Sequence, residues 1–456
     1  MSRIMRLKPA YILVGLLTAL PAAAADQEAV EPGASGLLEL YQQAQENDTR
    51  IVAAEANRRA GEYQQREALG RLLPQVSADA RGTRTRYENG PYKTYYYGER
   101  YSFSAQQVLF DMPAWQSFQR YRALSDQSGL DAEERISDAT VDLVQRYFEV
   151  LAAQDSLELV QAEKRVVSRN LDRIRSFFEK QLAPVTEKLE TEARFDRLIA
   201  DEIEAGNRVE VAREALSEIL GRPIYEQLKR LKPEPRLPER FDLGEFDSWR
   251  DEALASSALI AARQAAVEAQ RASMKQASGG HYPTLSLSAT AQKSNIGYEN
   301  SQSGRTQSGV LSLNLSVPLY SGGSTEARSD AEYERLVVAQ QELEGARREV
   351  LKEVRTAYMN ARSAVSRIKA TKVALSSSAR AREAAEKSFT YGVNNVVDVL
   401  DRTREEYSAK RDLLEAQYSF LISYMVLKRW SGSLGEADIL AIDDTLTADA
   451  DPVASR

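Results

Sequence analysis

The sequence predicts an α + β membrane protein in which long coiled-coil helices join a few membrane-spanning β-strands, with the whole unit duplicated along the chain. Three observations lead to this fold class. The 456-residue chain reads twice after residue 36, each half holds two segments of alternating polar and apolar residues, and each half then continues almost without glycine or proline. Alternation is typical of half-exposed strands, and long stretches without those two residues are typical of helices.

The composition excludes several classes of function. The chain has no cysteine, which rules out disulfides, thiolate metal sites, cysteine nucleophiles and cysteine-linked lipid anchors. Its one histidine, His281, precedes a predicted strand, where we expect a structural role rather than metal binding or acid–base catalysis. The net charge of −7 argues against general nucleic-acid binding. We therefore expect no enzyme, no cofactor and no nucleic-acid partner.

Residues 1–25 have the three parts of a secretory signal peptide. Three cations precede the apolar run Tyr11–Leu20, and the small residues Ala22–Ala25 follow with an Ala-x-Ala cleavage pattern. A membrane anchor is the alternative, but a run of this length rises only about 15 Å as a helix, roughly half of a hydrocarbon core. We expect an exported protein without a helical membrane span.

The rest of the chain indicates an internal duplication. Ile51–Ser77 aligns without gaps with Ile260–Ser286, 209 residues later, and eight of its 27 positions are identical. Farther along, Val185 matches Val396 at an offset of 211. Chance similarity between two stretches rich in Ala and Glu is the alternative, but an offset that drifts this slowly favours two copies of one large unit. The period is far longer than that of solenoid repeats.

The duplication divides the chain into five parts. These are the signal peptide 1–25, a first repeat 26–221, a linker or equatorial segment 222–250, a second repeat 251–432 and a C-terminal tail 433–456. Within each repeat the predicted order is helix, two strands, a long helix, a turn and another helix. The first helix is expected over Gly36–Leu69, where the alanines at 53, 56 and 60 share one face and would allow close helix packing.

The strand pairs are expected at about 75–110 and about 283–320. Alternation is clearest in Thr284–Ala291 and Leu311–Val317, and each strand is expected to be about ten residues long, enough to cross a bilayer when tilted. Loops are expected at Glu88–Lys93 and Asn295–Ser308, with tyrosines beside the first loop at a lipid–water boundary. Hairpins of a soluble sandwich are the alternative. The Ser, Thr, Gln and Asn on the polar sides favour a water-filled lumen instead.

Each repeat then predicts a long helical hairpin. A helix from about Ala114 to Leu182 would span on the order of 100 Å at 1.5 Å per residue. Heptad-like apolar spacing mixed with many charges fits coiled-coil packing better than a globular core. Each helix is interrupted once, at Gln181–Pro184 and at Tyr391–Asn395, and then resumes.

Four strands cannot span a membrane alone. An open sheet would leave two edges whose backbone groups lie unpaired in hydrocarbon, at several kcal/mol for each group. The strands must therefore join those of other copies in a closed barrel. Two chains would give eight strands and a nearly filled barrel, whereas three would give twelve and leave room for a channel, which we prefer.

Three segments carry a family resemblance. Ser278–Leu285 (SGGHYPTL), Leu315–Gly323 (LSVPLYSGG) and Tyr391–Asp401 (YGVNNVVDVLD) resemble signature segments of the TolC outer-membrane channel family, and the resemblance extends from about residue 37 to 441. It implies a homotrimer that shares a 12-stranded β-barrel in the outer membrane. A long α-helical barrel would continue into the periplasm and narrow at its inner end. Such channels join an inner-membrane ABC or other transporter through a periplasmic adaptor, for type I protein secretion or for drug efflux.

The resemblance also implies site residues. Two aspartates line the constriction in this family, and Asp398 and Asp401 match them. A preference of carboxylates for a helix N-terminus, at about 0.3–1 kcal/mol, is the alternative explanation for both. The family's gate is closed by a tyrosine and an arginine that bond a carboxylate, but those positions read Phe389, Asn394 and Glu187, so that latch does not transfer. Two further residues, Pro184 and Gly392, are the implied adaptor contacts at the hairpin tips.

Three functions follow from these observations. An export channel, preferably for type I secretion, explains the duplication, the strands and the helices together, with multidrug or small-molecule efflux as the alternative. A periplasmic coiled-coil adaptor would have one helical hairpin rather than two and no second pair of strands. An exported hydrolase would need two acids across a cleft, and nothing in the sequence places them there.

Overall fold

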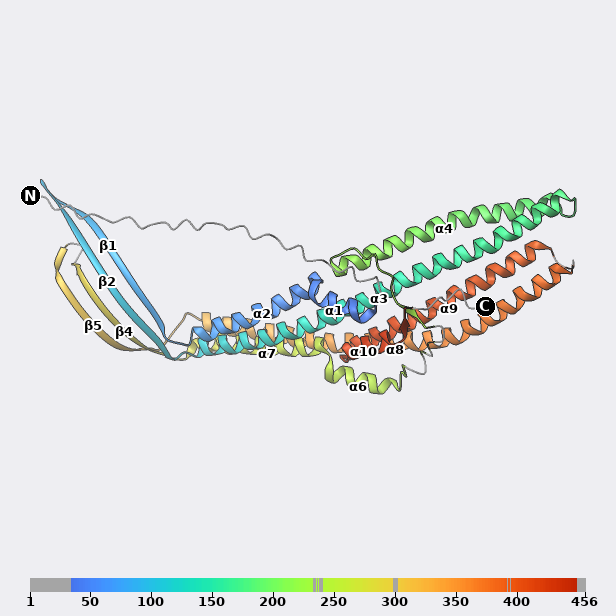
Figure 1. Cartoon of the computed structure of the whole chain (residues 1–456). Helices are drawn as coiled ribbons and strands as arrows, with labels where there is room; N and C mark the ends of the chain where they lie inside the picture. The colour runs from blue at the N-terminus through green and yellow to red at the C-terminus, as the bar shows by residue number, and fades with distance from the viewer. Residues whose placement is uncertain are drawn as a thin grey trace, which may run out of the picture.

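The computed structural model describes residues 34–232, 235, 237, 241–297, 302–391, 393 and 395–448. The predicted signal peptide lies outside the described residues, as do Gly392 and Asn394. The molecule is elongated, with its long strands at one end, the free ends of two helical hairpins at the other and short elements around the middle (Figure 1).

The order of elements is the same in both halves of the chain. The first half contains α1 (Leu37–Asn47), α2 (Thr49–Gly70), β1 (Gln75–Asn89), β2 (Tyr92–Phe110), α3 (Met112–Glu179) and α4 (Val185–Leu220). The second half contains α6 (Phe246–Ser256), α7 (Ala258–Ser278), a 3-10 turn (Gly279–His281), β4 (Thr284–Ile296), β5 (Gln302–Ser316), α8 (Ser324–Thr390) and α9 (Val396–Ser431). Around the middle lie β3 (Arg230–Leu231), α10 (Glu436–Asp443) and β6 (Leu446–Thr447).

The expected single helix Gly36–Leu69 is in fact two helices. The chain is extended at Asp48, whose carboxylate accepts a hydrogen bond from the backbone N–H of Arg50 and caps α2. Ser257 does the same for α7, accepting from the N–H of Ile260. Because Asp, Ser and similar side chains satisfy free N–H groups at helix starts, each marks a new helix rather than a helix interior. The two breaks lie 209 residues apart, as the duplication requires.

The prediction of strands of about ten residues was also wrong, because β1, β2, β4 and β5 have 15, 19, 13 and 15 residues. Much of each expected loop is paired strand. Only Gly90 and Pro91 separate β1 from β2, and Gly90 adopts φ 60°, which a tight hairpin turn requires. The tyrosine-rich segment expected beside a loop is therefore the end of a two-stranded ribbon.

The long strands form one antiparallel sheet in the order β1-β2-β4-β5, so the second strand of the first half pairs with the first strand of the second half. Ala78 pairs with Phe103, and Phe103 with Ala291, which places these apolar side chains on one face. On the other face the hydroxyls of Ser77 and Ser104 lie 2.8 Å apart. The predicted separation into an apolar and a polar face is present in the sheet.

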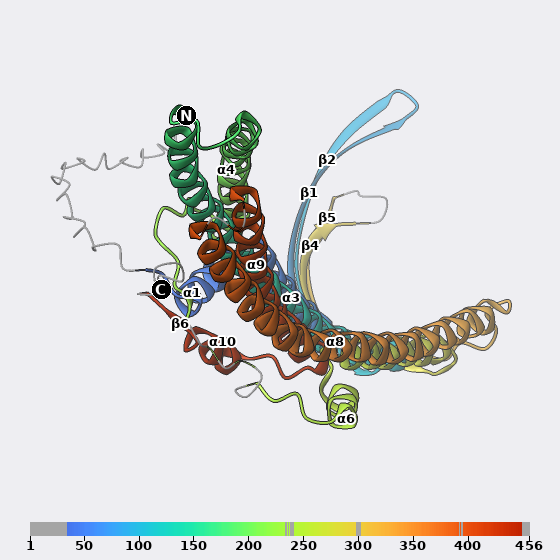
Figure 2. The same ribbon diagram turned by 90° about the vertical axis from the view of Figure 1, so that its right-hand side faces the viewer.

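The helices form two long antiparallel hairpins, α3–α4 and α8–α9, which lie along an arc with α6 and α10 outside it (Figure 2). The largest hydrophobic core lies near the middle, where α3 and α9 cross and where Tyr147, Phe148 and Phe420 are almost completely buried. Among the described helices, none is both long enough and apolar enough to cross a membrane.

Candidate functional site

The free ends of the two hairpins contain the residues expected to form the gate. In the first hairpin, Gln181 adopts φ 60° in the turn, and the exposed Pro184 occupies the N-cap position of α4. In the second, Asn395 caps α9 by accepting a 2.9 Å hydrogen bond from the N–H of Asp398. Both tips expose apolar side chains, since Leu182 is 71% and Tyr391 83% accessible.

Asp398 and Asp401 lie in the first two turns of α9, both exposed, as their spacing predicts. Their surroundings differ. Among the described residues Asp398 forms no ion pair, so its carboxylate is free to face solvent. Asp401 is 59% exposed, but one of its oxygens accepts a 2.8 Å hydrogen bond from the guanidinium of Arg194 on α4.

Arg194 is the centre of a small polar network that links three helices. Besides Asp401, it donates to the backbone carbonyl of Leu400 over 3.2 Å and lies 3.5 Å from Glu163 on α3. Arg194 is only 18% exposed, and burial raises the pKa of Glu163 while the Arg194 charge opposes that rise. The network therefore fastens the start of α9 to the first hairpin. Because Asp401 is 59% exposed, solvent weakens its ion pair with Arg194, and this link is a weak one.

The positions of the family's latch are arranged differently. The ring of Phe389 lies 4.6 Å from the guanidinium carbon of Arg173 on α3, which is a cation–π contact. Glu187 sits near the start of α4, and its backbone carbonyl accepts from the hydroxyl of Thr191. In the described part of the chain no hydrogen bond or ion pair joins the Glu187 carboxylate to the second hairpin. The structure thus brings Asp401 and Phe389 to the junction of the hairpins but not Glu187.

A small apolar cluster lies beneath this network. Its five buried members are Val167, Ile174, Leu198, Val396 and Leu400. They come from α3, α4 and α9, so the cluster and the Arg194 network hold the same junction.

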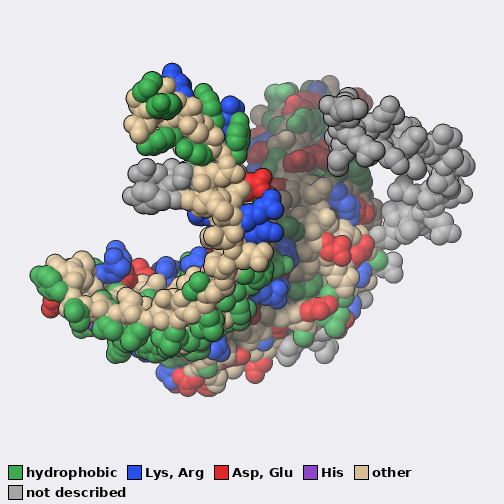
Figure 3. Space-filling view, turned by 90° about the vertical axis from the view of Figure 1, so that its left-hand side faces the viewer, with side chains coloured by type: hydrophobic (Ala, Val, Ile, Leu, Met, Phe, Trp, Pro, Cys, Tyr) green, Lys and Arg blue, Asp and Glu red, His purple; other side chains and the backbone are tan. Residues whose placement is uncertain are grey.

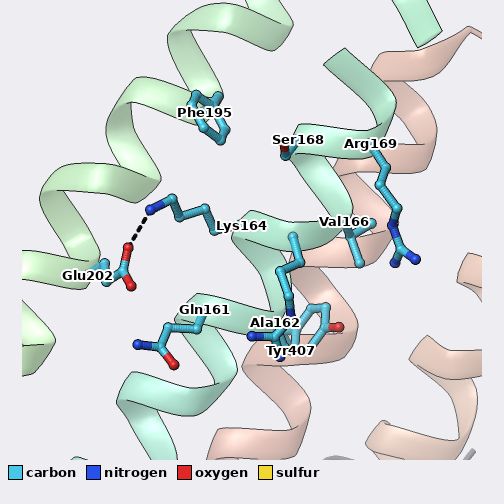
Figure 4. Close-up of a pocket in the computed structure, with 10 residues that line it drawn as sticks. Gln161, Ala162, Lys164, Val166, Ser168, Arg169, Phe195, Glu202 and Tyr407 are labelled. Carbon is cyan, nitrogen blue, oxygen red and sulfur yellow. Dashed lines mark hydrogen bonds and ion pairs between the residues drawn. The ribbon is translucent and has the colours of Figure 1, made fainter. Parts of the chain in front are cut away.

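A groove of about 650 Å³ opens beside the junction, between α3, α4 and α9 (Figure 4). Lys164 crosses it to form a 2.6 Å ion pair with Glu202, which is a further link between α3 and α4. Arg165 and Arg169 also line the groove, so the side of the first hairpin carries positive charge. In the described ranges no cluster of three or more histidine or acidic side chains could hold a metal ion.

Sequence reasoning missed Arg194, Glu163 and Arg173. Nothing in one sequence marks them, because Arg194 lies 207 residues before Asp401 and the helices between them are rich in arginine and glutamate. Only the packing of α9 against the first hairpin makes these residues neighbours.

Comparison with known proteins gives one family and several close relatives. The model of the family described as outer membrane efflux protein matches residues 40–222 and 249–433. Outer membrane protein TolC of Vibrio cholerae is 30% identical over 413 residues, covering 90% of this chain and 93% of that protein. Alkaline protease secretion protein AprF of Pseudomonas aeruginosa is 32% identical over 446 residues, covering 93% and 90%.

Solved structures agree on the fold. The open state of the MtrE outer membrane channel of Neisseria gonorrhoeae matches with a TM-score of 0.73 at 20% identity, over 88% of this chain and 90% of that one. The CusC structure matches with a TM-score of 0.74 at 16% identity, over 88% and 93%. Both similarities cover most of each chain, and they show the fold.

Proposed function

The chain belongs to the outer membrane efflux protein family, and we propose that it works as a trimeric channel-tunnel in type I protein secretion. Membership makes it a transport protein of the outer membrane with the α + β channel-tunnel fold. The proposal adds three subunits, a protein cargo, a periplasmic adaptor, and an inner-membrane ABC or other transporter that supplies the energy. The strands would share one 12-stranded barrel, and the helices would form the tunnel wall.

The observation that carries the proposal is the junction between the two halves of the sheet. β2 of the first half pairs with β4 of the second, which leaves β1 and β5 as open edges. Unpaired backbone groups in hydrocarbon cost several kcal/mol each. Pairing β5 of one chain with β1 of the next repeats the same kind of junction between chains. Three copies would then close a barrel wide enough for a channel.

The short helices before the strands support the same repetition. α7 packs against both α3 and α8, whereas α2 packs against α3 of its own half. Ala53, Ala56 and Ala60 on α2 are exposed, although the matching Ala262 and Ala269 on α7 are buried. The exposed alanine face would receive α8 of a neighbouring chain, because small side chains let helices approach closely.

We place the gate at Asp398 and Asp401. In a trimer six carboxylates would converge, which would favour cations over anions in the constriction. Arg194 holds the start of α9 against the first hairpin and would serve as the latch in place of the family's tyrosine and arginine. The exposed apolar tips, with Pro184 at the start of α4, would contact the adaptor, as would Gly392, which lies outside the described residues.

Blocking of single-channel current by cations tests the gate. In planar bilayers, D398A/D401A should lose block by a multivalent cation such as hexamminecobalt, because the convergent charge is gone. E187A/E190A removes the same charge from the tip of the first hairpin and should leave block intact. Unchanged block in D398A/D401A would place the constriction elsewhere.

Deletion of the gene separates secretion from efflux. The name of the AprF relative, a protein of alkaline protease secretion, favours a protein cargo, while the family's description favours efflux. Loss of a secreted protein from the culture medium, with unchanged sensitivity to antibiotics and dyes, is the expected result. New drug sensitivity with normal secretion would assign the chain to efflux.

A further inference from the structure

The β1–β2 ribbon extends well beyond the second pair of strands. Pairing of β2 with β4 ends at Arg100, opposite Ser294, whereas pairing of β1 with β2 continues to Asn89 and Tyr92. The β1–β2 ribbon reaches farther from the helices than β4 and β5 do (Figure 2). This free part, residues 82–99, has two faces that continue the two faces of the sheet below.

The outward face can be assigned from the apolar belt. Phe103, Leu311 and Leu313 are large, exposed and on the apolar face, so this face meets lipid in an outer-membrane protein. Cross-strand partners share a face, and β1 pairs with β2 without a register shift. The outward face of the free ribbon therefore consists of four cross-strand pairs: Gly82–Glu99, Arg84–Tyr97, Arg86–Tyr95 and Glu88–Lys93.

Charge on the free ribbon lies entirely on this outward face. The opposite face has only uncharged residues, which are Thr83, Thr85, Tyr87, Asn89, Tyr92, Thr94, Tyr96 and Gly98. On the neighbouring hairpin, Lys293 and Arg305 also have outward positions, because Lys293 pairs with Tyr101 and with Gln307. The outward cations are thus Arg84, Arg86, Lys93, Lys293 and Arg305, against the carboxylates of Glu88 and Glu99.

The height of these cations matches the edge of a membrane. On β4 the outward residues are apolar from Leu285 to Ala291, and Lys293 follows. The eight steps from Leu285 to Lys293 cover about 27 Å along the strand. Strands of such barrels are tilted by about 40°, so this length corresponds to about 21 Å of height, within the apolar band of about 25 Å. Arg84 lies four residues beyond the level of Lys293, about 14 Å farther along the strand and about 10 Å higher, at the level of the lipid headgroups.

The guanidinium of Arg84 is available to bind an anionic ligand. Its guanidinium carbon lies 5.3 Å and 5.4 Å from the ring centres of Tyr95 and Tyr97, and it makes no ion pair with any described residue. Glu88, by contrast, is already paired with both Arg86 and Lys93. At the strand end of the molecule, basic and hydrophobic side chains lie side by side on the tip of the ribbon (Figure 3). A guanidinium that lies against two aromatic rings and has no carboxylate partner keeps its paired N–H donors available for the oxygens of a phosphate.

We propose that the outward face of the β1–β2 ribbon, centred on Arg84, Tyr95 and Tyr97, binds the phosphate-bearing headgroups of anionic lipids in the outer leaflet. The ribbon continues the lipid-facing surface past the apolar belt, and its charge complements those headgroups. Binding there would fix the height and tilt of the barrel in the membrane. The proposal needs outer-membrane placement but neither the gate nor a particular cargo, so either can fail without the other.

The test compares two variants that remove the same charge from opposite faces of the ribbon. R84S/R86S removes two outward cations, and R81S/R100S removes two cations that pair across the strands on the other face. The full-length protein in neutral detergent is titrated with phosphatidylglycerol or phosphatidylcholine of the same acyl chains, and bound lipid is counted by native mass spectrometry. The wild type should prefer phosphatidylglycerol. R84S/R86S should reduce that preference about 30-fold, since each of the two cations contributes about 1 kcal/mol near an anionic surface.

R81S/R100S should change the preference less than twofold. Equal losses in both variants, or none in R84S/R86S, would overturn the proposal, since net charge alone or another surface would then decide lipid binding. E88Q/E99Q removes the outward carboxylates and should raise the preference for phosphatidylglycerol. This variant keeps the proposal testable if R84S/R86S does not assemble, and a fall or no change would contradict it.

Discussion

The two hairpins are joined in two places, and the two junctions are built differently. Near the middle, α3 and α9 cross inside the largest core, where Tyr147, Phe148, Phe420 and Leu421 are buried and the Phe148 ring stacks on Tyr418. Near the free ends, five buried residues and the Arg194 network hold α9 to the first hairpin. The difference indicates a firm joint at the middle and a weak one at the free ends, where we propose the gate.

This contrast suggests how a closed tunnel could open without unfolding. Apolar burial contributes about 25 cal/mol for each Å², so the large core resists separation far more than the small cluster does. Local opening occurs first where few buried contacts exist. The hairpin ends could therefore move apart while the middle of the molecule stays intact as the hinge.

Truncation of a buried side chain in each junction gives the largest difference between them. Leu421→Ala should lower the free energy of unfolding by about 4–5 kcal/mol, because it leaves a cavity that the main core cannot fill. Leu400→Ala, the same change in the tip cluster, should cost only about 2–3 kcal/mol, because the small cluster can collapse around it. Chemical unfolding followed by circular dichroism measures both. Equal costs would mean that the two junctions do not differ as proposed.

The firm junction contains one group that should weaken it at neutral pH. Burial raises the pKa of Asp155 to about 6, although a hydrogen bond from Tyr418 and the charge of Arg230 oppose the rise, with Glu158 adding to it. Because the folded pKa exceeds the unfolded value of 3.8, folded protein binds more protons between those values. Stability should fall by on the order of 3 kcal/mol as pH rises from about 4 to about 6.

Asp155→Asn should abolish that dependence and make the protein more stable than wild type at pH 7.5 but not at pH 4. Tyr418→Phe is the control, since it removes the hydroxyl that donates to Asp155 but leaves the carboxyl. The pKa of Asp155 should then rise further, so the loss of stability should continue above pH 6. Unfolding curves at several pH values measure the effect. A wild-type stability independent of pH from 4 to 7 would show that Asp155 is not the buried acid described.

Loss of the Arg194 link should affect stability least and gating most. Arg194→Ala should lower the free energy of unfolding by no more than about 1 kcal/mol, as is typical for a partly exposed ion pair. The open probability or conductance of single channels should nevertheless rise, because α9 loses its attachment to α4. Arg175→Ala removes the 3.0 Å pair with Glu192 inside the first hairpin and should leave conductance unchanged. Equal conductance in both variants would reject the latch.

The sequence predicts the plan of the fold well and its boundaries less well. Alternation in β4 and β5 and long glycine-free stretches in α3 and α8 predict the right elements in the right order. The errors in helix boundaries come from single residues, since Asp48 and Ser257 cap new helices where the apolar pattern continues. The strands of the tyrosine-rich ribbon were expected to be shorter, with a loop at Glu88–Lys93, because the polar and aromatic residues there do not alternate by hydrophobicity, although the backbone pairs as far as Asn89 and Tyr92.

The candidate site was predictable only in part. The exposure of Asp398 and Asp401 on α9 follows from their spacing after a helix break. Arg194 does not, because its role depends on which face of α4 meets α9, a property of packing across 207 residues of chain. The sequence shows that Phe389 departs from the family's latch, but it does not show which residues would replace that latch.

The account depends on identical chains closing the sheet that one chain leaves open at β1 and β5. Light scattering of the purified protein in detergent, corrected for bound detergent, tests this directly by giving the number of chains in the particle. We predict three chains, in a particle that conducts ions when placed in a planar bilayer. A stable particle with a single chain and no conductance would contradict the account.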